Sequence, residues 1–250
     1  MFGGFSGLPF QGQSGDKVVG SVATTAISAL FKHTEALEAR VKANPVSKIL
    51  QGSLDGFDFW GQGLQMYNGL RLAALSLQVE AVAIDLSALL TGQVKLKTST
   101  RSTMRVVLSE EDLTRSFNTP FILEKLQQVS FEGQALYFSD IEVQLLDDNQ
   151  LSLSAKVGVG STSNPVALSL KARLELQDDQ RVVFTDVVYD GEGQTVALAQ
   201  TLITHTNSLL DVEKFNLDGV QLRFQRCDTR DRKLIFKGTA RFDQFPKRRS

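Results

Sequence analysis

Long runs in which apolar and polar residues alternate are the sequence feature that most constrains this fold. In one run the residues of one parity are apolar: Val94, Leu96, Met104, Val106 and Leu108. In another they are Val166, Leu168, Leu170, Leu174 and Leu176. Successive side chains of a β-strand point to opposite faces, so a period of two predicts strands with one dry and one wet face. Both runs exceed the usual strand length of about five or six residues.

Short polar segments separate the alternating runs and set their direction. They are Asp147–Asn149, Asp178–Asp179 and Cys227–Asp231. Links this short join antiparallel neighbours, because parallel pairs need long crossovers. The sequence therefore predicts an antiparallel sheet that is largely a meander. Two runs change parity midway, after Val79 and after Phe138, and each change predicts a β-bulge that bends its strand.

The segment before Asn44-Pro45 has a helical period instead. Its apolar residues recur at steps of three and four: Val18, Val19, Val22, Ala26, Leu30, Leu37 and Val41. Proline disfavours helix in the residue before it, so this helix should end at Asn44. Three shorter helices are expected: one begins at Ser109, one at Thr119-Pro120 and one at Gln194, from their capping residues and spacing.

The expected fold is α+β, with a long N-terminal helix packed in a strongly curved antiparallel β-sheet and short additional helices. We expect residues 1–15 to form a flexible Gly-rich N-terminal segment, because glycines interrupt its apolar residues. Residues 16–245 should form a single domain, and residues 246–250 a basic tail.

Composition argues against several functions. The chain has 27 Lys and Arg against 28 Asp and Glu, so no overall field attracts nucleic acid or an anionic bilayer, and any basic patch must be local. The two histidines, His33 and His205, stand in no recognised nucleophile or metal spacing. Cys227 is the only cysteine, so no intrachain disulfide forms. We therefore expect no catalytic residue, metal or cofactor.

The N-terminus MFGGFSGLPF lacks the early positive charge and the continuous apolar segment of a secretory signal. No stretch approaches the apolar length of a membrane-spanning helix. These observations predict a cytoplasmic protein that contacts a membrane only peripherally.

Residues 70–122 resemble a known family. They contain LRLAALSLQVEAVAIDLSALLTG, then a strand with basic alternate residues, then VVLSEEDLTRSFNTPFI. This order is similar to that of the LmeA-like phospholipid-binding family, and a weaker resemblance covers residues 16–245. The resemblance implies a fold like the tubular lipid-binding (TULIP) superfamily and an acyl-chain ligand. Exported members carry a signal peptide, so by resemblance a cyanobacterial form facing the cytoplasm or the thylakoid fits better.

The strands also suggest a binding face. Seven or more one-sided strands present more apolar area than the expected helices cover. The remainder must close on itself, grip a protein partner or hold an apolar guest. We favour a phospholipid or other acyl lipid. The alternatives are a scaffold or assembly factor using the same face, and an enzyme, for which Glu80 and Asp186 are the nearest carboxylates. Parity predicts this lining: Leu75, Leu77, Val82, Ile84, Leu96, Met104, Val106, Val143, Leu168, Leu170, Leu222, Phe224 and Phe236.

A basic face lies opposite the apolar one. Lys95, Lys97, Arg101 and Arg105 share one side of one strand, and they predict a surface for lipid headgroups at a membrane. Lys171 and Arg173 would extend it, or Arg223, Lys233, Lys237 and Arg241, depending on which strands adjoin. The other interpretation is a solvated face that keeps sheet edges from aggregating.

Overall fold

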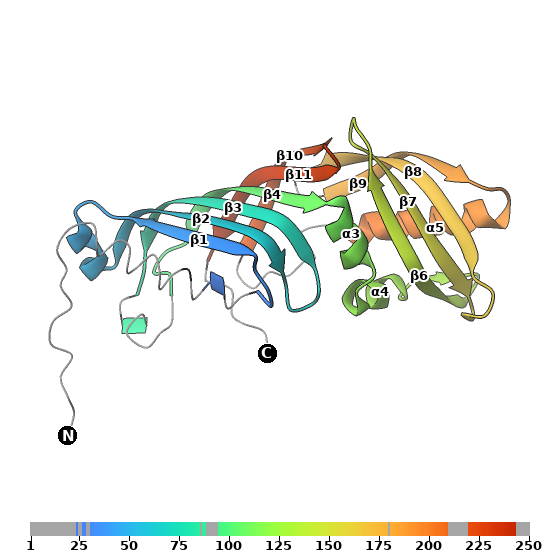
Figure 1. The fold of residues 1–250 in the computed structure, drawn as a ribbon, viewed down its shortest axis with the longest axis horizontal. Coiled ribbons are helices and arrows are strands. Elements are labelled where there is room, and N and C mark those ends of the chain that lie inside the picture. Colours follow the sequence, from blue (N-terminus) through green and yellow to red (C-terminus); the bar gives the residue numbers. More distant parts are fainter. Residues whose placement is uncertain are drawn as a thin grey trace, which may run out of the picture.

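The computed structural model describes Thr24 and residues 27–28, 31–85, 87–88, 95–179, 181–209 and 220–243. Two antiparallel sheets follow one another along the long axis of the molecule (Figure 1). The six-stranded sheet has the order β1 (Ala36–Lys42), β2 (Ser53–Gln65), β3 (Arg71–Ala83), β4 (Thr100–Ser109), β11 (Lys233–Phe242), β10 (Val220–Arg230). The five-stranded sheet has the order β5 (Ser130–Phe131), β6 (Gln134–Leu145), β7 (Gln150–Val159), β8 (Val166–Gln177), β9 (Arg181–Asp190).

The meander predicted from the short turns is confirmed, but it forms two sheets instead of one. The chain builds β1 to β4, crosses to build β5 to β9, and returns with β10 and β11 to pair with β4. The last turn is shorter than predicted, since Cys227–Arg230 belong to β10. Asp231 and Arg232 make this turn, with φ angles of 52° and 55°, which is the backbone of the two-residue turns that match the twist of a hairpin.

The long N-terminal helix is wrong over its second half. Ala36–Lys42 form β1, which pairs with β2 from Ala36 opposite Gln62 to Lys42 opposite Gly56. Leu37, Ala39 and Val41 alternate with charged residues, so this stretch also fits a period of two, and pairing with β2 decides between the two patterns. Of the predicted helix before residue 31, only Thr24, Ile27 and Ser28 lie within the described residues, and they are helical.

The two predicted phase changes have different structures. In β6 the register with β7 shifts between Ser139 and Glu142, and Asp140 has a φ of 52°, so the predicted bulge is confirmed. In β3 the kink lies at Ala81, where φ is 46°. The paired strand β2 changes phase at the same place. The register between β2 and β3 is the same on both sides of the kink, with Leu54 opposite Val82 and Phe57 opposite Val79. Both strands therefore bend together without an inserted residue.

The three shorter helices are confirmed as α3 (Glu110–Phe117), α4 (Pro120–Leu126) and α5 (Gln194–Leu209), and a 3-10 helix, η1 (Val46–Gln51), precedes β2. The Ser109 and Asp112 side chains form a reciprocal capping box at the start of α3. The Thr119 side chain accepts from the Ile122 N–H at the start of α4. These caps satisfy backbone N–H groups that a helix start leaves unpaired.

Helix α3 bonds the part of β6 that the short β5 leaves unpaired. Glu110, Thr114 and Asn118 are spaced by four residues and lie on one side of the helix. The Glu110 carboxylate accepts from the Leu145 N–H at 2.9 Å, and Thr114 Oγ1 accepts from the Val143 N–H at 3.0 Å. Asn118 accepts from the Ile141 N–H at 3.1 Å and donates to the Ile141 carbonyl at 2.6 Å. These side chains pair backbone groups that a further strand would otherwise pair.

A second side of α3 bonds the six-stranded sheet. The Arg71 backbone N–H of β3 donates to Ser116 Oγ at 3.0 Å, and the Arg71 guanidinium donates to Asp112 at 3.2 Å. Asp112 and Ser116 are both buried. Helix α3 therefore holds β3 of one sheet and β6 of the other through two different sides.

The main hydrophobic core also joins the two sheets. It contains Met104 of β4, Phe224 of β10 and Phe236 of β11 together with Leu145 of β6 and Phe184 of β9. Asn149 in the β6–β7 turn and Thr229 of β10 also join the two sheets. The Asn149 side chain accepts from the Thr229 N–H at 2.8 Å, and Thr229 Oγ1 accepts from the Asn149 N–H at 2.7 Å. The two sheets are thus joined both by apolar packing and by hydrogen bonds between side chains and backbone N–H groups.

Asn118→Ala removes two hydrogen bonds to the edge of β6. Because each net bond contributes about 1 kcal/mol, we expect the free energy of unfolding to fall by about 1–2 kcal/mol in urea denaturation. Asn164→Ala, in the exposed β7–β8 turn, is the control and should change it by less than about 0.5 kcal/mol. Equal losses in the two variants would contradict the bonding role of Asn118.

Glu110 should make stability depend on pH. The hydrogen bond from Arg232 is the main cause that lowers the pKa of Glu110, and the Leu145 N–H lowers it further. A lowered pKa stabilises the fold above the unfolded value of about 4.3, and this contribution is lost as the pH falls through the folded pKa. The stability difference between wild type and Glu110→Gln should therefore be largest near neutral pH and shrink below about pH 5. Urea denaturation over this range measures it, and a constant difference would contradict the assignment.

Candidate functional site

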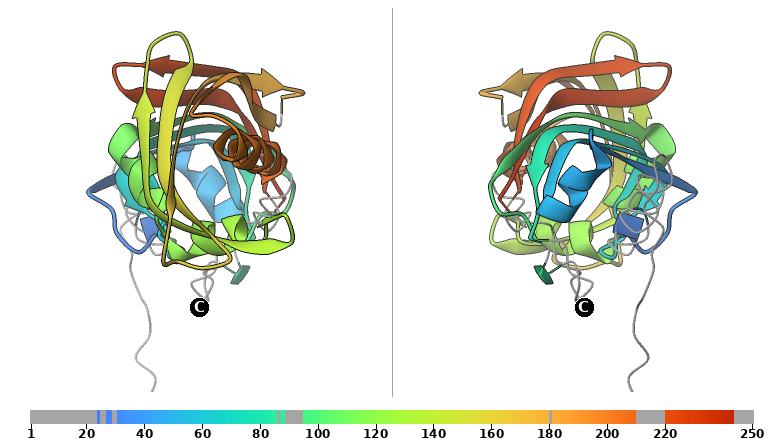
Figure 2. Two further views of the ribbon diagram at one scale, coloured as in Figure 1. Left: turned by 90° about the vertical axis from the view of Figure 1, so that its right-hand side faces the viewer. Right: turned by 90° about the vertical axis from the view of Figure 1, so that its left-hand side faces the viewer.

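One face of the six-stranded sheet is apolar across all of its strands, and we call it the inner face. Its register forms three rows of residues directly opposite one another. The first row is Leu37, Gly61, Leu75, Val106, Phe236 and Cys227. The second is Ala39, Phe59, Leu77, Met104, Gly238 and Phe224. The third is Val41, Phe57, Val79, Ser102, Ala240 and Leu222. The sheet curls around η1 (Figure 2), whose Ile49 is buried in the same apolar cluster as Phe57 and Phe59.

Burial is uneven along this face. Where β10 and β11 meet the five-stranded sheet, Phe224 and Phe236 are buried with ring centroids 4.8 Å apart. Toward the middle of the sheet, Leu75, Leu77 and Val106 stay partly exposed, as does Leu222 of β10. At the β1–β2 end, Ala39, Val41, Phe57 and Phe59 are buried as well. Among the residues of the three rows, the partly exposed side chains are Leu37, Leu75, Leu77, Val106 and Leu222.

The structure divides the predicted lining into three groups. The register brings together the largest group on the inner face: Leu75, Leu77, Met104, Val106, Leu222, Phe224 and Phe236. A second group, Val82, Ile84 and Leu96, lies in the apolar cluster at the far end of the same sheet. The third group belongs to the five-stranded sheet, where Val143 and Leu170 lie in the core between the sheets and Leu168 packs with α4 and α5.

Sequence reasoning missed the contribution of β1 and β2 to this face. The helical pattern before Pro45 includes Leu37 and Val41, and the alternating runs used to predict the lining do not include Phe57 and Phe59. The signal was present in β2, where Phe57 and Phe59 alternate with Asp58 and Trp60. The phase change near Gly56 shortens the alternating run in β2, so the run is difficult to recognise in the sequence.

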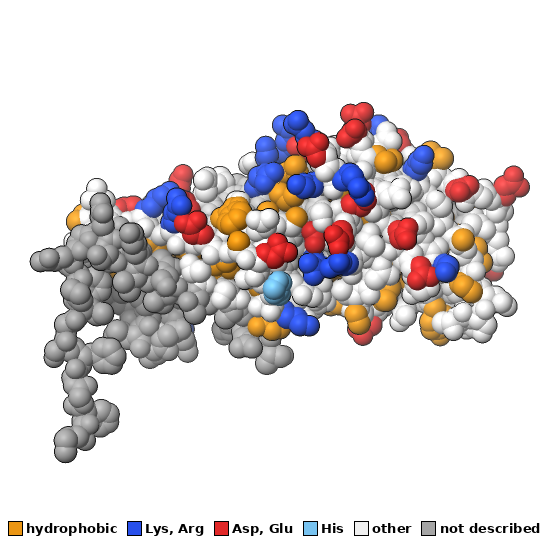
Figure 3. All heavy atoms as spheres, in the orientation of Figure 1, with side chains coloured by type: hydrophobic (Ala, Val, Ile, Leu, Met, Phe, Trp, Pro, Cys, Tyr) orange, Lys and Arg blue, Asp and Glu red, His pale blue; other side chains and the backbone are white. Residues whose placement is uncertain are grey.

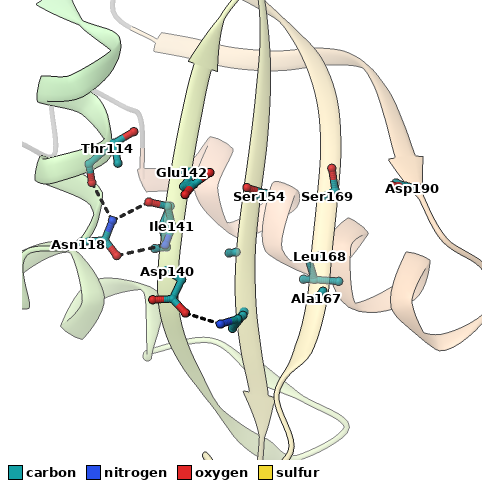
Figure 4. A pocket seen from close by; sticks show the side chains of 12 residues that line it. Thr114, Asn118, Asp140, Ile141, Glu142, Ser154, Ala167, Leu168, Ser169 and Asp190 are labelled. Carbon is teal, nitrogen blue, oxygen red and sulfur yellow. Dashed lines mark hydrogen bonds and ion pairs between the residues drawn. The ribbon is translucent and has the colours of Figure 1, made fainter.

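A hollow lies on the five-stranded sheet beside α3 and has a volume of about 690 Å³ (Figure 4). Its strand residues include a polar row, since Glu142 faces Ser154, Ser154 faces Ser169 and Ser169 faces Asp190. Asp140 at its margin pairs with Lys156 at 2.7 Å. This polar row suits an apolar chain less well than the inner face does.

Titratable groups lie away from the inner-face rows, except for Cys227. Burial, with a smaller effect of Asp228, raises the pKa of the Cys227 thiol to about 12. Glu80 and Asp186 are exposed and lie on different sheets, and Asp186 pairs with Arg173 at 3.2 Å. No group of three or more His, Cys, Asp or Glu that could hold a metal ion occurs among the described residues.

The basic residues predicted to meet headgroups are all exposed. Arg101 and Arg105 lie on the outer face of β4, opposite Arg241 and Lys237 of β11. Lys95 and Lys97 lie before β4, so the expectation that all four basic residues share one strand is wrong. The Lys95 carbonyl accepts from the Asp85 N–H, and the Lys97 N–H donates to the Ala83 carbonyl. The adjoining strands are therefore β11 and β10, so Arg223, Lys233, Lys237 and Arg241 extend this surface, whereas Lys171 and Arg173 belong to the other sheet.

Comparison with known proteins identifies the family. Residues 12–239 match the model of the LmeA-like phospholipid-binding family. This match covers most of the chain, so the chain belongs to that family, and the resemblance of residues 70–122 is confirmed. No curated protein and no solved structure matches the chain. Among the described residues, no helix has the length and apolar character needed to span a bilayer.

The buried position of Cys227 predicts a slow thiol. Since the raised pKa leaves almost no thiolate near pH 8, the native protein should react with iodoacetamide about 100-fold more slowly than free cysteine. In denaturant the rate should rise to that of free cysteine. Mass spectrometry of timed reactions measures both rates, and rapid labelling of the native protein would contradict the burial of Cys227 in this row.

Proposed function

We propose that the inner face of the six-stranded sheet binds the acyl chains of a phospholipid or another acyl lipid. The observation that carries this proposal is the continuous set of apolar rows whose middle, around Leu75, Leu77 and Val106, stays partly exposed. A contiguous apolar surface that meets water is a typical site for an apolar ligand or partner. Membership of a phospholipid-binding family supports the lipid class.

The energetics favour a chain-like guest. Each methylene transferred from water to an apolar surface contributes about 0.8 kcal/mol. A bound acyl chain would also remove from water the exposed parts of Leu75, Leu77 and Val106, which the fold leaves incompletely covered. In this proposal these three residues and Leu222 line the site, Val82, Ile84 and Leu96 extend it, and Val143, Leu168 and Leu170 act as supporting core.

The same rows support binding without catalysis. Ser102 is the one hydroxyl residue among them, and its side chain donates to the Ala240 carbonyl at 3.4 Å. The Cys227 thiol is held protonated by its raised pKa. General acid–base chemistry needs a titratable group within hydrogen-bond reach of the substrate, and the carboxylates considered from the sequence, Glu80 and Asp186, are exposed away from this face.

Leu77→Trp tests the proposal, because the larger side chain would occupy the space of the guest. We expect the variant to retain stability to within about 1 kcal/mol and to take up much less fluorescent phospholipid from vesicles than wild type. Native mass spectrometry of the gently purified wild type should detect bound lipid, and the variant should carry less.

Val188→Trp is the matched control, since Val188 is 66% exposed on β9 of the other sheet, and its lipid uptake should equal that of wild type. If wild type carries no lipid and takes up none, the proposal fails. A stoichiometric protein bound to the inner face in place of lipid would instead support a scaffold or assembly role. A loss of about 1–3 kcal/mol in Leu77→Trp with unchanged lipid uptake would identify this region as closed core.

A further inference from the structure

Charge is segregated along the six-stranded sheet. Strands β4, β10 and β11 carry eight Lys or Arg and one Asp, whereas β1, β2 and β3 carry three Lys or Arg and four Asp or Glu. The whole chain is nearly neutral, with 27 basic and 28 acidic residues. Figure 3 shows Lys and Arg side chains gathered over the region of these three strands. The positive charge is therefore local to one end of the sheet.

The register concentrates this charge on the outer face, opposite the inner face. Arg105 faces Lys237, and Lys237 faces Arg226. Arg101 faces Arg241 in a neighbouring row. Like charges directly opposite one another in a sheet are destabilising. Like charges therefore repel one another across β4, β11 and β10. A bound anion would reduce this repulsion.

Pairing differs between the two ends of the sheet. On β1, Arg40 pairs with Glu38 at 2.7 Å, and Lys42 pairs with Asp58 of β2 at 2.6 Å. On the basic end, Arg226 pairs with Asp228 at 2.6 Å and Arg241 with Asp243 at 3.1 Å. Within the part of the chain that the structure describes, Arg101, Arg105, Arg223 and Lys237 form no ion pair. Their charge remains available to a partner.

Trp60 lies on the same outer face. It faces Ser76 of β3, and Ser76 faces Arg105, so the ring belongs to the row that continues through Lys237 and Arg226. Trp60 is 42% exposed and is the only tryptophan of the chain. Tryptophan side chains favour the level of lipid headgroups, where the ring is half apolar and half wet.

We propose that this basic outer face docks on an anionic lipid bilayer. Its contacts are Arg101, Arg105, Arg223, Arg226, Lys237 and Arg241, with Trp60 at its edge. Trp60 is exposed in the same row as the unpaired Arg105 and Lys237, which favours a bilayer over a nucleic acid, because apolar contact accompanies charge at a membrane surface. This proposal depends on the function proposed above in one respect, the choice of a lipid surface as the anionic partner. It would place an acyl-binding face and a headgroup-binding face on opposite sides of one sheet.

Vesicle flotation of the full chain tests the docking. Wild type should bind phosphatidylcholine vesicles that contain about 30% phosphatidylglycerol and should bind pure phosphatidylcholine vesicles weakly. The double variant Arg105→Gln/Lys237→Gln should bind about 30-fold more weakly, because each basic residue near an anionic surface contributes a factor of about five. Arg40→Gln/Lys42→Gln removes the same charge from the paired end and is the matched control, with binding close to that of wild type.

Trp60 provides a second measurement that needs no variant. Its fluorescence emission should shift to shorter wavelength when anionic vesicles are added and should stay unchanged with pure phosphatidylcholine. The docking proposal is overturned if the shift is absent, if the two double variants lose binding equally, or if a short DNA duplex displaces the protein from vesicles and binds it more tightly. A protein that docks on anionic vesicles yet takes up no lipid would retain this proposal and overturn the acyl-binding function.

Discussion

The structure depends on the hydrogen bonds by which α3 holds two sheets at once. Glu110, Thr114 and Asn118 bond the edge of β6, and Asp112 and Ser116 bond Arg71 of β3. Unpaired backbone groups at a sheet edge are costly when buried and invite other strands when exposed. One eight-residue helix removes both problems at β6, and it does so while fixing the position of that sheet relative to the other.

This junction determines how the rest of the chain is used. Because the sheets meet at β10 and β11, the inner face is closed core at that end, where Phe224 and Phe236 contact each other. Away from the junction, the β1–β2 end is also buried, whereas Leu75, Leu77 and Val106 between the two ends stay partly exposed. The acyl-binding site is proposed at these residues, in keeping with membership of a phospholipid-binding family.

The two faces of the six-stranded sheet have opposite chemistry because a strand alternates its side chains. Apolar residues such as Met104 point inward, and the intervening Arg101 and Arg105 point outward. The pairing of β4 with β11, and of β11 with β10, repeats this arrangement over three strands. An apolar face and a cationic face therefore arise from one pattern, without any dedicated loop.

Several features depend on neighbouring residues and are therefore predictable from the sequence: the alternation of β4 and β8, the caps of α3 and α4, and the bulge in β6. Other features depend on partners far away in the chain and follow from tertiary contacts alone. Residues 36–42 fit both a helical and an alternating pattern, and pairing with β2 made them a strand. The alternation of apolar and polar residues places both Leu77 and Leu168 on the apolar face of a strand. Contacts between residues far apart in the chain determine which element covers that face. Helices α4 and α5 cover Leu168, whereas Leu77 stays partly exposed, because local periodicity specifies the direction of a side chain and not its neighbour.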